Sequence, residues 1–266
     1  MRDTIRIGQI PYLNCVLFFH ELKNREGIRL EPLVPRALSG AARDAVVDAG
    51  PVPLVDTWAL EERFMPLGDF CIATTERARS VFLLSKRPFE QLDGAEIGMT
   101  AESSTSVRLL KVLLANAWRV RPARFTAVNR TGNDAFLLIG DEALMHRRGL
   151  PDFPHVADLG EVWSKWTGLP FVFARWVVRR DLPDAQREYL IHALNQSLAS
   201  GWSQLDRIAA TYASALHMSI AEIREYLEGF RFVATDEEHR AMTKFRTLDA
   251  GTGGGNATPL AREEAR

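Results

Sequence analysis

Short apolar segments of β-rich composition alternate with amphipathic segments along the first 180 residues, and this alternation constrains the fold more than any other feature. Residues 4–10 (TIRIGQI) alternate polar and apolar side chains, which predicts a first strand that Pro11 ends. Further strands are predicted at 28–34, 70–74 and 80–85, and helices at 15–22 and 39–47, the second capped by Ser39. Residues 50–55 are predicted to form a rigid turn that leads into a short extended or helical segment. The pattern predicts an α/β protein with a mostly parallel sheet.

A second unit of the same kind is expected to begin near Lys86. The apolar strand predicted at 169–178 then returns the chain to the first unit, and long helices follow from Leu182. We therefore expect two lobes, with two crossings between them that form a hinge and a cleft, a frequent place for small-molecule sites. The expected divisions are a first lobe of residues 1–85 and 175–250, an inserted second lobe of 86–174, and a mobile tail of 251–266.

Composition excludes several functional classes. Lys plus Arg total 33 against 34 Asp plus Glu, so the net charge is −1 and the basic surplus of a nucleic-acid-binding protein is missing. Two cysteines, Cys15 and Cys71, give neither a disulfide scaffold nor a zinc motif, and we expect no metal. The N-terminal residues lack the apolar core of a signal peptide, and the longest apolar stretch is too short to span a membrane. These features predict a cytoplasmic protein without a membrane or nucleic-acid partner.

Four consecutive hydroxyl residues, Ser103, Ser104, Thr105 and Ser106, stand at the start of a helix predicted to run to about residue 118. Their side chains would lie beside backbone N–H groups that the first helical turn leaves unpaired, where the helix dipole adds partial positive charge. Such a segment can bind a carboxylate or a phosphate. An ordinary helix cap needs only one of these residues, so both interpretations stay open, and the run of four favours a ligand.

Five other residues lie at the ends of predicted strands and could face the cleft. Asn14 follows the first strand, where its amide could bind two oxygens of a ligand or could cap a helix. Ser80 begins a buried strand and Arg79 precedes it; the alternatives are a strand-end residue and a solvated cation. Gly140 ends an apolar strand and permits close approach of a ligand to the backbone. Asp141 could bind a ligand or complement the dipole of the next helix.

Familiar catalytic motifs are missing from the chain. It contains no GxSxG, Walker A, HExxH or GxGxxG sequence, and its six histidines show no spacing typical of metal ligands or proton relays. Aromatic residues gather late in the second predicted lobe, where core packing is the expected role and a ligand-stacking wall the alternative. They are Trp163, Trp166, Phe171, Phe173 and Trp176.

Several stretches together resemble the chorismate dehydratase family, which opens the futalosine route to menaquinone. The combination of TGLPFVFA, LIGDEAL and YLN is specific to that family, although none of the three would be so alone. The resemblance covers about residues 4–248. The stretches are IPYLNC (10–15), DAGPVPLVD (48–56), RSVFLLSK (79–86), ESSTSVRLLKVLL (102–114), LIGDEAL (138–144), DLGEVWSKWTGLPFVFARWVVR (158–179) and YLEGFRF (226–232).

The resemblance implies a two-lobed type II fold like that of periplasmic solute-binding proteins, with the ligand between the lobes. It implies the conversion of chorismate to 3-[(1-carboxyvinyl)oxy]benzoate and water, without a cofactor. Catalytic roles are implied for Asn14 and Ser80. Substrate-binding roles are expected for Arg79, Ser103, Ser104, Thr105, Ser106, Gly140 and Asp141.

Two departures from the family pattern occur. Many relatives carry arginine where this chain has Ser104, so an anion contact is missing or is supplied elsewhere, with Arg79 as a candidate. A proline usual shortly after the YLN motif is also absent. A sister branch, similar to cyclic dehypoxanthinyl futalosine synthase, shares the fold but carries a motif resembling PCPND. The PYLNC of this chain argues against that branch.

The chemistry of this reaction suits the residues. Formation of an aromatic ring by loss of water is strongly downhill, and an amide does not titrate near neutrality, so Asn14 is expected to orient the substrate while the enolpyruvyl carboxylate takes the proton. Ser80 and the hydroxyls of residues 103–106 are expected to hold the carboxylates. A non-catalytic receptor for a small carboxylate is the first rival hypothesis. The oligomeric state and the identity of the proton acceptor stay open.

Overall fold

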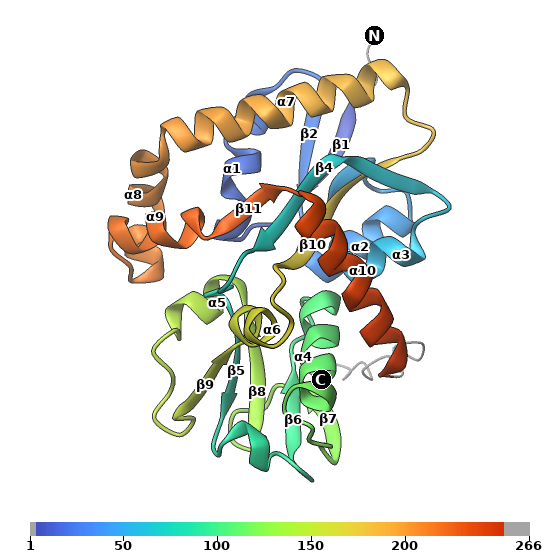
Figure 1. The fold of residues 1–266 in the computed structure, drawn as a ribbon. Coiled ribbons are helices and arrows are strands. Elements are labelled where there is room, and N and C mark those ends of the chain that lie inside the picture. Colours follow the sequence, from blue (N-terminus) through green and yellow to red (C-terminus); the bar gives the residue numbers. More distant parts are fainter. Residues whose placement is uncertain (1–3, 253–266) are drawn as a thin grey trace, which may run out of the picture.

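The computed structural model describes residues 4–252, which form two lobes, each built around its own β-sheet (Figure 1). The first sheet has the order β11-β4-β10-β3-β1-β2 and the second β7-β6-β8-β5-β9. The first contains β1 (Ile5–Gln9), β2 (Ile28–Pro32), β3 (Ala49–Pro53), β4 (Phe64–Thr74), β10 (Phe171–Arg179) and β11 (Phe230–Val233). The second contains β5 (Val81–Ser85), β6 (Glu96–Met99), β7 (Arg124–Ala127), β8 (Ala135–Ile139) and β9 (His155–Asp158).

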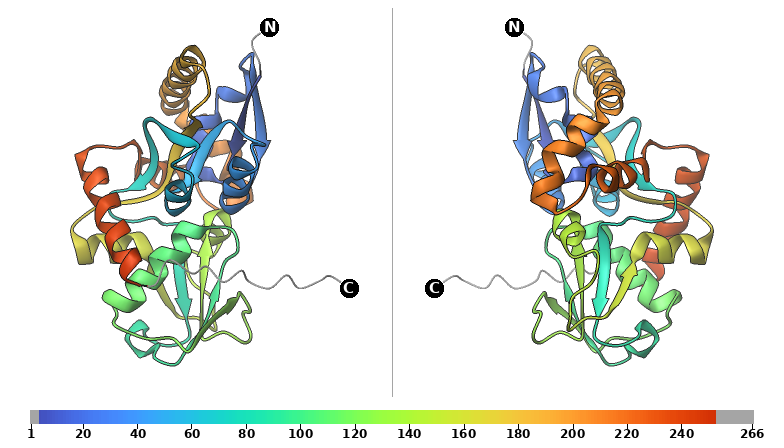
Figure 2. Two further views of the ribbon diagram at one scale, coloured as in Figure 1. Left: turned by 90° about the vertical axis from the view of Figure 1, so that its right-hand side faces the viewer. Right: turned by 90° about the vertical axis from the view of Figure 1, so that its left-hand side faces the viewer.

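Helices cover both sheets, and the two side views separate the lobes clearly (Figure 2). The first lobe carries α1 (Val16–Phe19), α2 (Pro35–Arg43), α3 (Leu54–Ala59), α7 (Asp184–Ser203), α8 (Leu205–Leu216) and α9 (Ile220–Glu228). The second carries α4 (Ser104–Asn116), α5 (Gly140–Met145) and α6 (Leu159–Thr167), and α10 (Asp236–Gly251) follows β11. Short 3-10 turns are η1 (Leu13–Cys15), η2 (Leu22–Asn24) and η3 (Phe89–Gln91). The α/β class and the two-lobed arrangement are as the sequence predicts.

The prediction of a mostly parallel sheet is wrong, because both sheets are mixed. β1 runs parallel to β2 and β3, whereas β10 is antiparallel to β3 and β4, and β11 is antiparallel to β4. In the second sheet β6 is parallel to β7 and β8, and β5 is antiparallel to β8 and β9. In the first sheet the reason is the inserted second lobe. β4 leads toward that lobe and β10 returns from it, so β10 lies between β3 and β4 and is antiparallel to both.

The crossings between the lobes differ from the expected boundaries. β5 pairs in the second sheet, so the chain leaves the first lobe between Thr74 and Val81 rather than after residue 85. The return comes before β10, which begins at Phe171. Of the tail expected from residue 251, Gly251 ends α10, and residues 253–266 lie outside the described part.

Three local expectations also need correction. The helix expected to begin at Ser39 begins four residues earlier at Pro35, a residue well suited to a first helical position, and Ser39 is buried inside it. The expected turn at 50–55 is β3 followed by α3. The helix expected over 15–22 is instead three short pieces, η1, α1 and η2. The sequence also did not predict β11, because this short strand lies between two segments with helical periodicity.

The last helix, α10, reaches from the first lobe to the second. Phe245 on α10 packs against Trp163 and Phe171, with ring centroids 5.8 Å and 4.9 Å away, and Arg108 of α4 forms an ion pair with Asp249. Core packing is therefore the role of Trp163, as the sequence predicts. Trp176 belongs to a different core, where it packs against Phe18.

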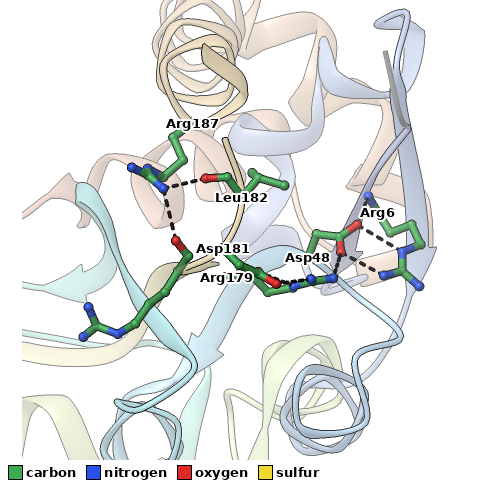
Figure 3. Close-up of polar contacts among 7 residues, drawn as sticks. Arg6, Asp48, Arg179, Asp181, Leu182 and Arg187 are labelled. Atoms are coloured by element: carbon green, nitrogen blue, oxygen red, sulfur yellow. Dashed lines mark hydrogen bonds and ion pairs between the residues drawn. The ribbon is translucent and has the colours of Figure 1, made fainter. Parts of the chain in front are cut away.

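A buried carboxylate ties three strands of the first sheet together (Figure 3). Asp48, directly before β3, accepts hydrogen bonds from the backbone N–H of Arg6 at 2.9 Å and from its guanidinium at 2.8 and 3.0 Å. Arg179, on β10, donates to the same carboxylate at 3.0 Å. Burial alone would raise the pKa of Asp48, but these hydrogen bonds and charges outweigh it and lower that pKa.

No helix within residues 4–252 combines the length and the apolar character that crossing a bilayer requires.

Candidate active site

A cavity of about 500 Å³ lies between the lobes, and both contribute to its wall. Hollows between two lobes are frequent places for small-molecule sites. The wall includes the ends of β1 and β8, the start of α4, the crossing segment before β5, and β10. The lining residues are Ile10, Tyr12, Asn14, Cys15, Pro35, Pro53, Ile72, Ala78, Ser80, Val81, Ser103, Ser106, Ile139, Gly140, Phe173, Ala174 and Phe230.

The cavity brings together five of the nine residues that the sequence singled out. Asn14, Ser80, Ser103, Ser106 and Gly140 line it. The other four do not line it: they are Arg79, Ser104, Thr105 and Asp141.

Asn14 sits in η1, the turn that follows β1. The alternative that it caps a helix is not what the structure shows: Tyr12 precedes η1, Cys15 precedes α1, and neither helix start receives a side-chain cap. Its carbonyl Oδ1 accepts a hydrogen bond from the Cys15 thiol at 3.2 Å. The turn is held from the second lobe, because the backbone N–H of Leu13 donates to Oδ1 of Asp141 at 3.0 Å. Asn14 therefore presents an uncharged amide to the cavity from a position that depends on contact between the lobes.

Ser80 is buried at the first crossing between the lobes, directly before β5. Its hydroxyl donates to the carbonyl of Ala78 at 3.2 Å and accepts from the hydroxyl of Tyr226 at 2.8 Å. Burial raises the pKa of Tyr226 well above its usual value, so this phenol keeps its proton and acts as a donor. Tyr226 was missed as a functional residue, although it opens the YLEGFRF stretch. The sequence could not show which way its hydroxyl points.

The run of hydroxyl residues at the start of α4 divides into two pairs. Ser103 caps the helix, its Oγ accepting from the N–H of Ser106 at 3.2 Å, and the two hydroxyls lie 3.1 Å apart. Both line the cavity beside the helix N-terminus. Ser104 and Thr105 face α3 of the first lobe, where Ser104 donates to Asp56 and Thr105 accepts from the N–H of Val55 at 3.3 Å. Ser103 and Ser106 thus belong both to the helix cap and to the cavity wall, whereas Ser104 and Thr105 connect the two lobes.

Arg79 and Asp141 do not line the cavity, and their contacts are with residues outside its wall. Arg79 adopts a left-handed backbone (φ 56°), and its N–H donates to the buried carboxylate of Asp158 at 2.6 Å. Its guanidinium forms an ion pair with Glu225 at 2.7 Å instead of turning inward. Burial raises the pKa of Asp141, and its hydrogen bond from Leu13 opposes that shift.

Tyr12 and Gly140 form a close contact between the lobes at the cavity. Gly140 has φ 63°, and a Cβ built on it would lie 3.0 Å from the ring of Tyr12. Only glycine fits both the left-handed backbone and this close approach. The hydroxyl of Tyr12 donates to the carboxylate of Glu102, in the loop before α4. Neither Tyr12 nor Glu102 was predicted as a site residue, because the pair forms only when the lobes meet.

The cavity wall carries no charged side chain within residues 4–252. Burial raises the pKa of the Cys15 thiol well above its usual value, so that thiol stays neutral. In the same part of the chain no group of three His, Cys, Asp or Glu side chains is placed to hold a metal ion. The polar groups that face the cavity are thus an amide, three serine hydroxyls and the start of a helix, the donors that bind carboxylates or developing negative charge.

Comparison with solved structures identifies the fold. A protein of Archaeoglobus fulgidus superposes with a TM-score of 0.73 at 17% identity, covering 94% of this chain and 98% of that one. A Candida albicans protein described as having the generic periplasmic binding protein fold has a TM-score of 0.66 at 13% identity, over 99% and 92% of the two chains. The alkanesulfonate-binding protein of Xanthomonas axonopodis pv. citri has 0.65 at 14%, over 98% and 95%. The chain therefore has the two-lobed fold of periplasmic binding proteins.

Comparison of sequences identifies the family. The chorismate dehydratase of Thermus thermophilus is 30% identical over 256 residues, which cover 90% of this chain and 93% of that protein. The family model for menaquinone biosynthesis matches residues 5–250. The matched region contains both lobes and every residue of the cavity wall, and the chain belongs to this menaquinone biosynthesis family.

Proposed function

We propose that this protein is a chorismate dehydratase, a carbon–oxygen lyase that converts chorismate to 3-[(1-carboxyvinyl)oxy]benzoate and water. The observation that carries the proposal is the wall of the cavity: Asn14 and Ser80, the two residues with implied catalytic roles, line the same cavity together with the start of α4. The similarity to the Thermus thermophilus enzyme supports the same activity. We extend the proposal to a cytoplasmic location, as expected for a biosynthetic enzyme that acts on a soluble metabolite.

The reaction removes a proton from the ring carbon that bears the enolpyruvyl ether and a hydroxyl group from the neighbouring ring carbon. The C–H electron pair becomes part of the new aromatic ring, and the C–O pair leaves with the hydroxyl oxygen. The removed proton joins that oxygen, so the products are the substituted benzoate and one water molecule. The protein needs to place the groups, assist proton transfer and stabilise charge on the departing oxygen.

The proton acceptor in this proposal is the enolpyruvyl carboxylate of the substrate. Two titratable groups of the protein line the cavity: Cys15 and Tyr12. Burial raises the pKa of both, so each keeps its proton at neutral pH and cannot act as a base. Asn14 binds and orients this carboxylate through its amide, which has the geometry to donate to one oxygen while accepting from a hydroxyl.

Ser80 and the start of α4 stabilise negative charge. The bond from Tyr226 leaves the Ser80 hydroxyl proton to point toward Ala78 or toward a ligand. Ser103 and Ser106 provide hydroxyls beside the positive end of the helix dipole, which suits the ring carboxylate. Because these donors lie in a cavity walled largely by apolar side chains, their interaction with charge is stronger than it would be in water.

Incubation of the purified protein with chorismate tests the proposal. We expect an enolpyruvyl benzoate to appear by ultraviolet absorbance and chromatography without any added cofactor. Saturable binding of chorismate without turnover would instead identify a carboxylate receptor. Unchanged chorismate and no binding would also contradict the lyase assignment.

A further inference from the structure

A second groove lies on the first lobe, directly behind the cavity wall. It runs between the end of β1, the segment from η1 to η2, and α8, and it encloses about 950 Å³. Two residues, Ile10 and Tyr12, line both the groove and the cavity. The remaining lining residues are Gln9, Pro11, Val16, Phe19, His20, Lys23, Arg207, Ile208, Thr211 and Tyr212. The groove and the cavity are therefore neighbours that share part of their walls.

The charged residues that line the groove are all basic. Lys23 comes from η2 and Arg207 from α8, and both are exposed. Within residues 4–252 neither Lys23 nor Arg207 forms an ion pair with a carboxylate; Arg207 donates to the amide oxygen of Gln204 at 3.1 Å. The nearest acid to His20 is Glu21, 3.9 Å from its Nε2. Two uncompensated positive charges thus stand at one opening in a chain whose net charge is −1.

The groove and the cavity differ in the charge of the residues that line them. A dianionic substrate finds no cation among the cavity-wall residues. The attraction that brings it to the protein must then come from outside the cavity, and a groove lined by one sign of charge raises the local concentration of an oppositely charged ligand.

We propose that this groove is the entrance vestibule of the cavity, in which Lys23 and Arg207 collect a small dicarboxylate before it passes Tyr12. Tyr12 is carried by the first lobe, whereas its two contacts, Gly140 and Glu102, belong to the second. Separation of the lobes frees the Tyr12 ring from both contacts and connects the groove to the cavity. Closure of the lobes returns the Tyr12 ring to Gly140 and separates the bound ligand from the charges of the vestibule. The ligand then contacts the neutral amide and hydroxyl groups of the cavity wall.

The inference rests on the proposed function for the identity of its ligand, and its test uses chorismate. The variant is Lys23→Gln with Arg207→Gln, and the matched control is Lys244→Gln with Arg240→Gln, two exposed cations on α10. At an ionic strength of about 10 mM, where the Debye length is about 30 Å, we expect kcat/KM of the variant to fall about 5- to 20-fold with kcat unchanged. At about 1 M salt, where that length is about 3 Å, the difference from wild type should shrink to less than about twofold.

Three further results decide the matter. The control pair should keep the wild-type kcat/KM at both salt concentrations, and the conservative pair Lys23→Arg with Arg207→Lys should retain at least about half of it. Equal kcat/KM for variant and wild type at low salt would overturn the vestibule. An equal loss at both salt concentrations would overturn it as well, because it would indicate a short-range contact or a folding defect. Failure of the wild-type protein to turn over chorismate contradicts the proposed function instead, and binding of chorismate at the two salt concentrations then tests the vestibule.

Discussion

Asn14 and Ser80, two residues of the cavity wall, differ in how firmly neighbouring groups hold their side chains. In the described part of the chain, the Asn14 side chain accepts one hydrogen bond, from the Cys15 thiol, which is a weak donor, and it caps neither η1 nor α1. Ser80, by contrast, is buried and held by Tyr226. Removal of Asn14 should therefore alter the reaction without altering stability, whereas changes around Ser80 should alter both.

Replacement of Asn14 by alanine tests this directly. We expect kcat to fall at least about 100-fold, the size of effect seen when one preorganised donor is lost. The melting temperature should change by less than about 2 °C, because no cap or buried hydrogen bond network is removed. The exposed Asn24 of the same lobe gives a matched control, Asn24→Ala, with wild-type turnover. A large fall in melting temperature for Asn14→Ala would refute the assignment and favour a structural role.

Tyr226→Phe removes the hydroxyl that donates to Ser80 while keeping the packed ring. Ser80 then loses its fixed orientation, so we expect kcat to fall about 10-fold with little change in KM. Stability should fall by about 1–2 kcal/mol, since one buried hydrogen bond disappears. Steady-state kinetics and urea unfolding measure the two effects. An unchanged kcat alongside the stability loss would show that the bond serves folding alone.

Elements of the first lobe are joined by charge as well as by apolar packing. Asp48 links β1 through Arg6 and β10 through Arg179, across a sheet in which β10 has re-entered from the other lobe (Figure 3). The loop that leads from β10 to α7 is held by Arg187, whose guanidinium donates to the carbonyl of Leu182 at 2.5 Å. A local sequence pattern predicts each strand, but it does not show that residues 6, 48 and 179 meet.

Asp48 gives a pH-dependent prediction. Its pKa is lower in the folded protein than its usual value of 3.8, so its contribution to stability is complete above about pH 4 and is lost as the pH falls through the folded-state pKa. Asp48→Asn should lower the free energy of unfolding by about 1–3 kcal/mol at pH 7. The difference between variant and wild type should close as the pH drops below about 3.8. Denaturant unfolding at several pH values measures it, and a difference independent of pH would contradict the ion-pair account.

At the scale of the whole molecule, the lobes meet through contacts from segments far apart in the chain. Tyr12 bonds Glu102, Leu13 bonds Asp141, Ser104 bonds Asp56, and α10 lies against both lobes. The contacts of Tyr12 with Glu102 and of Leu13 with Asp141 fix the position of η1, the turn that carries Asn14. The contacts that join the lobes around the cavity are therefore also the contacts that position the Asn14 amide.

The pair Tyr12 and Glu102 tests this coupling by a double-mutant cycle. We expect Tyr12→Phe and Glu102→Ala each to raise KM about 3- to 10-fold, because the closed form loses one contact between the lobes. The double variant should be no worse than the poorer single variant, since both remove the same hydrogen bond. Glu90→Ala, at an exposed acid on the second lobe, serves as the control. Additive effects of the two substitutions would show that the residues act independently of each other.

The sequence by itself determined the fold class and the positions of its most strongly patterned elements. Periodicity and turn residues placed β1, β8, α4 and the late helices to within a few residues, because those signals are local. It also placed Asn14, Ser80 and the hydroxyl run beside element ends, where ligands bind. It misjudged strand direction, since parallel and antiparallel partners share one local pattern when both faces are buried.

Tertiary structure alone decided which of the candidate residues face the cavity. Ser103 and Ser106 face it and Ser104 and Thr105 do not, because the helical turn points neighbouring side chains in different directions and the other lobe occupies one of them. Tyr12, Glu102 and Tyr226 gained their roles from contacts spanning 90 and 146 positions of sequence. Such contacts depend on how two separately folded sheets dock, and no local pattern of residues encodes that docking.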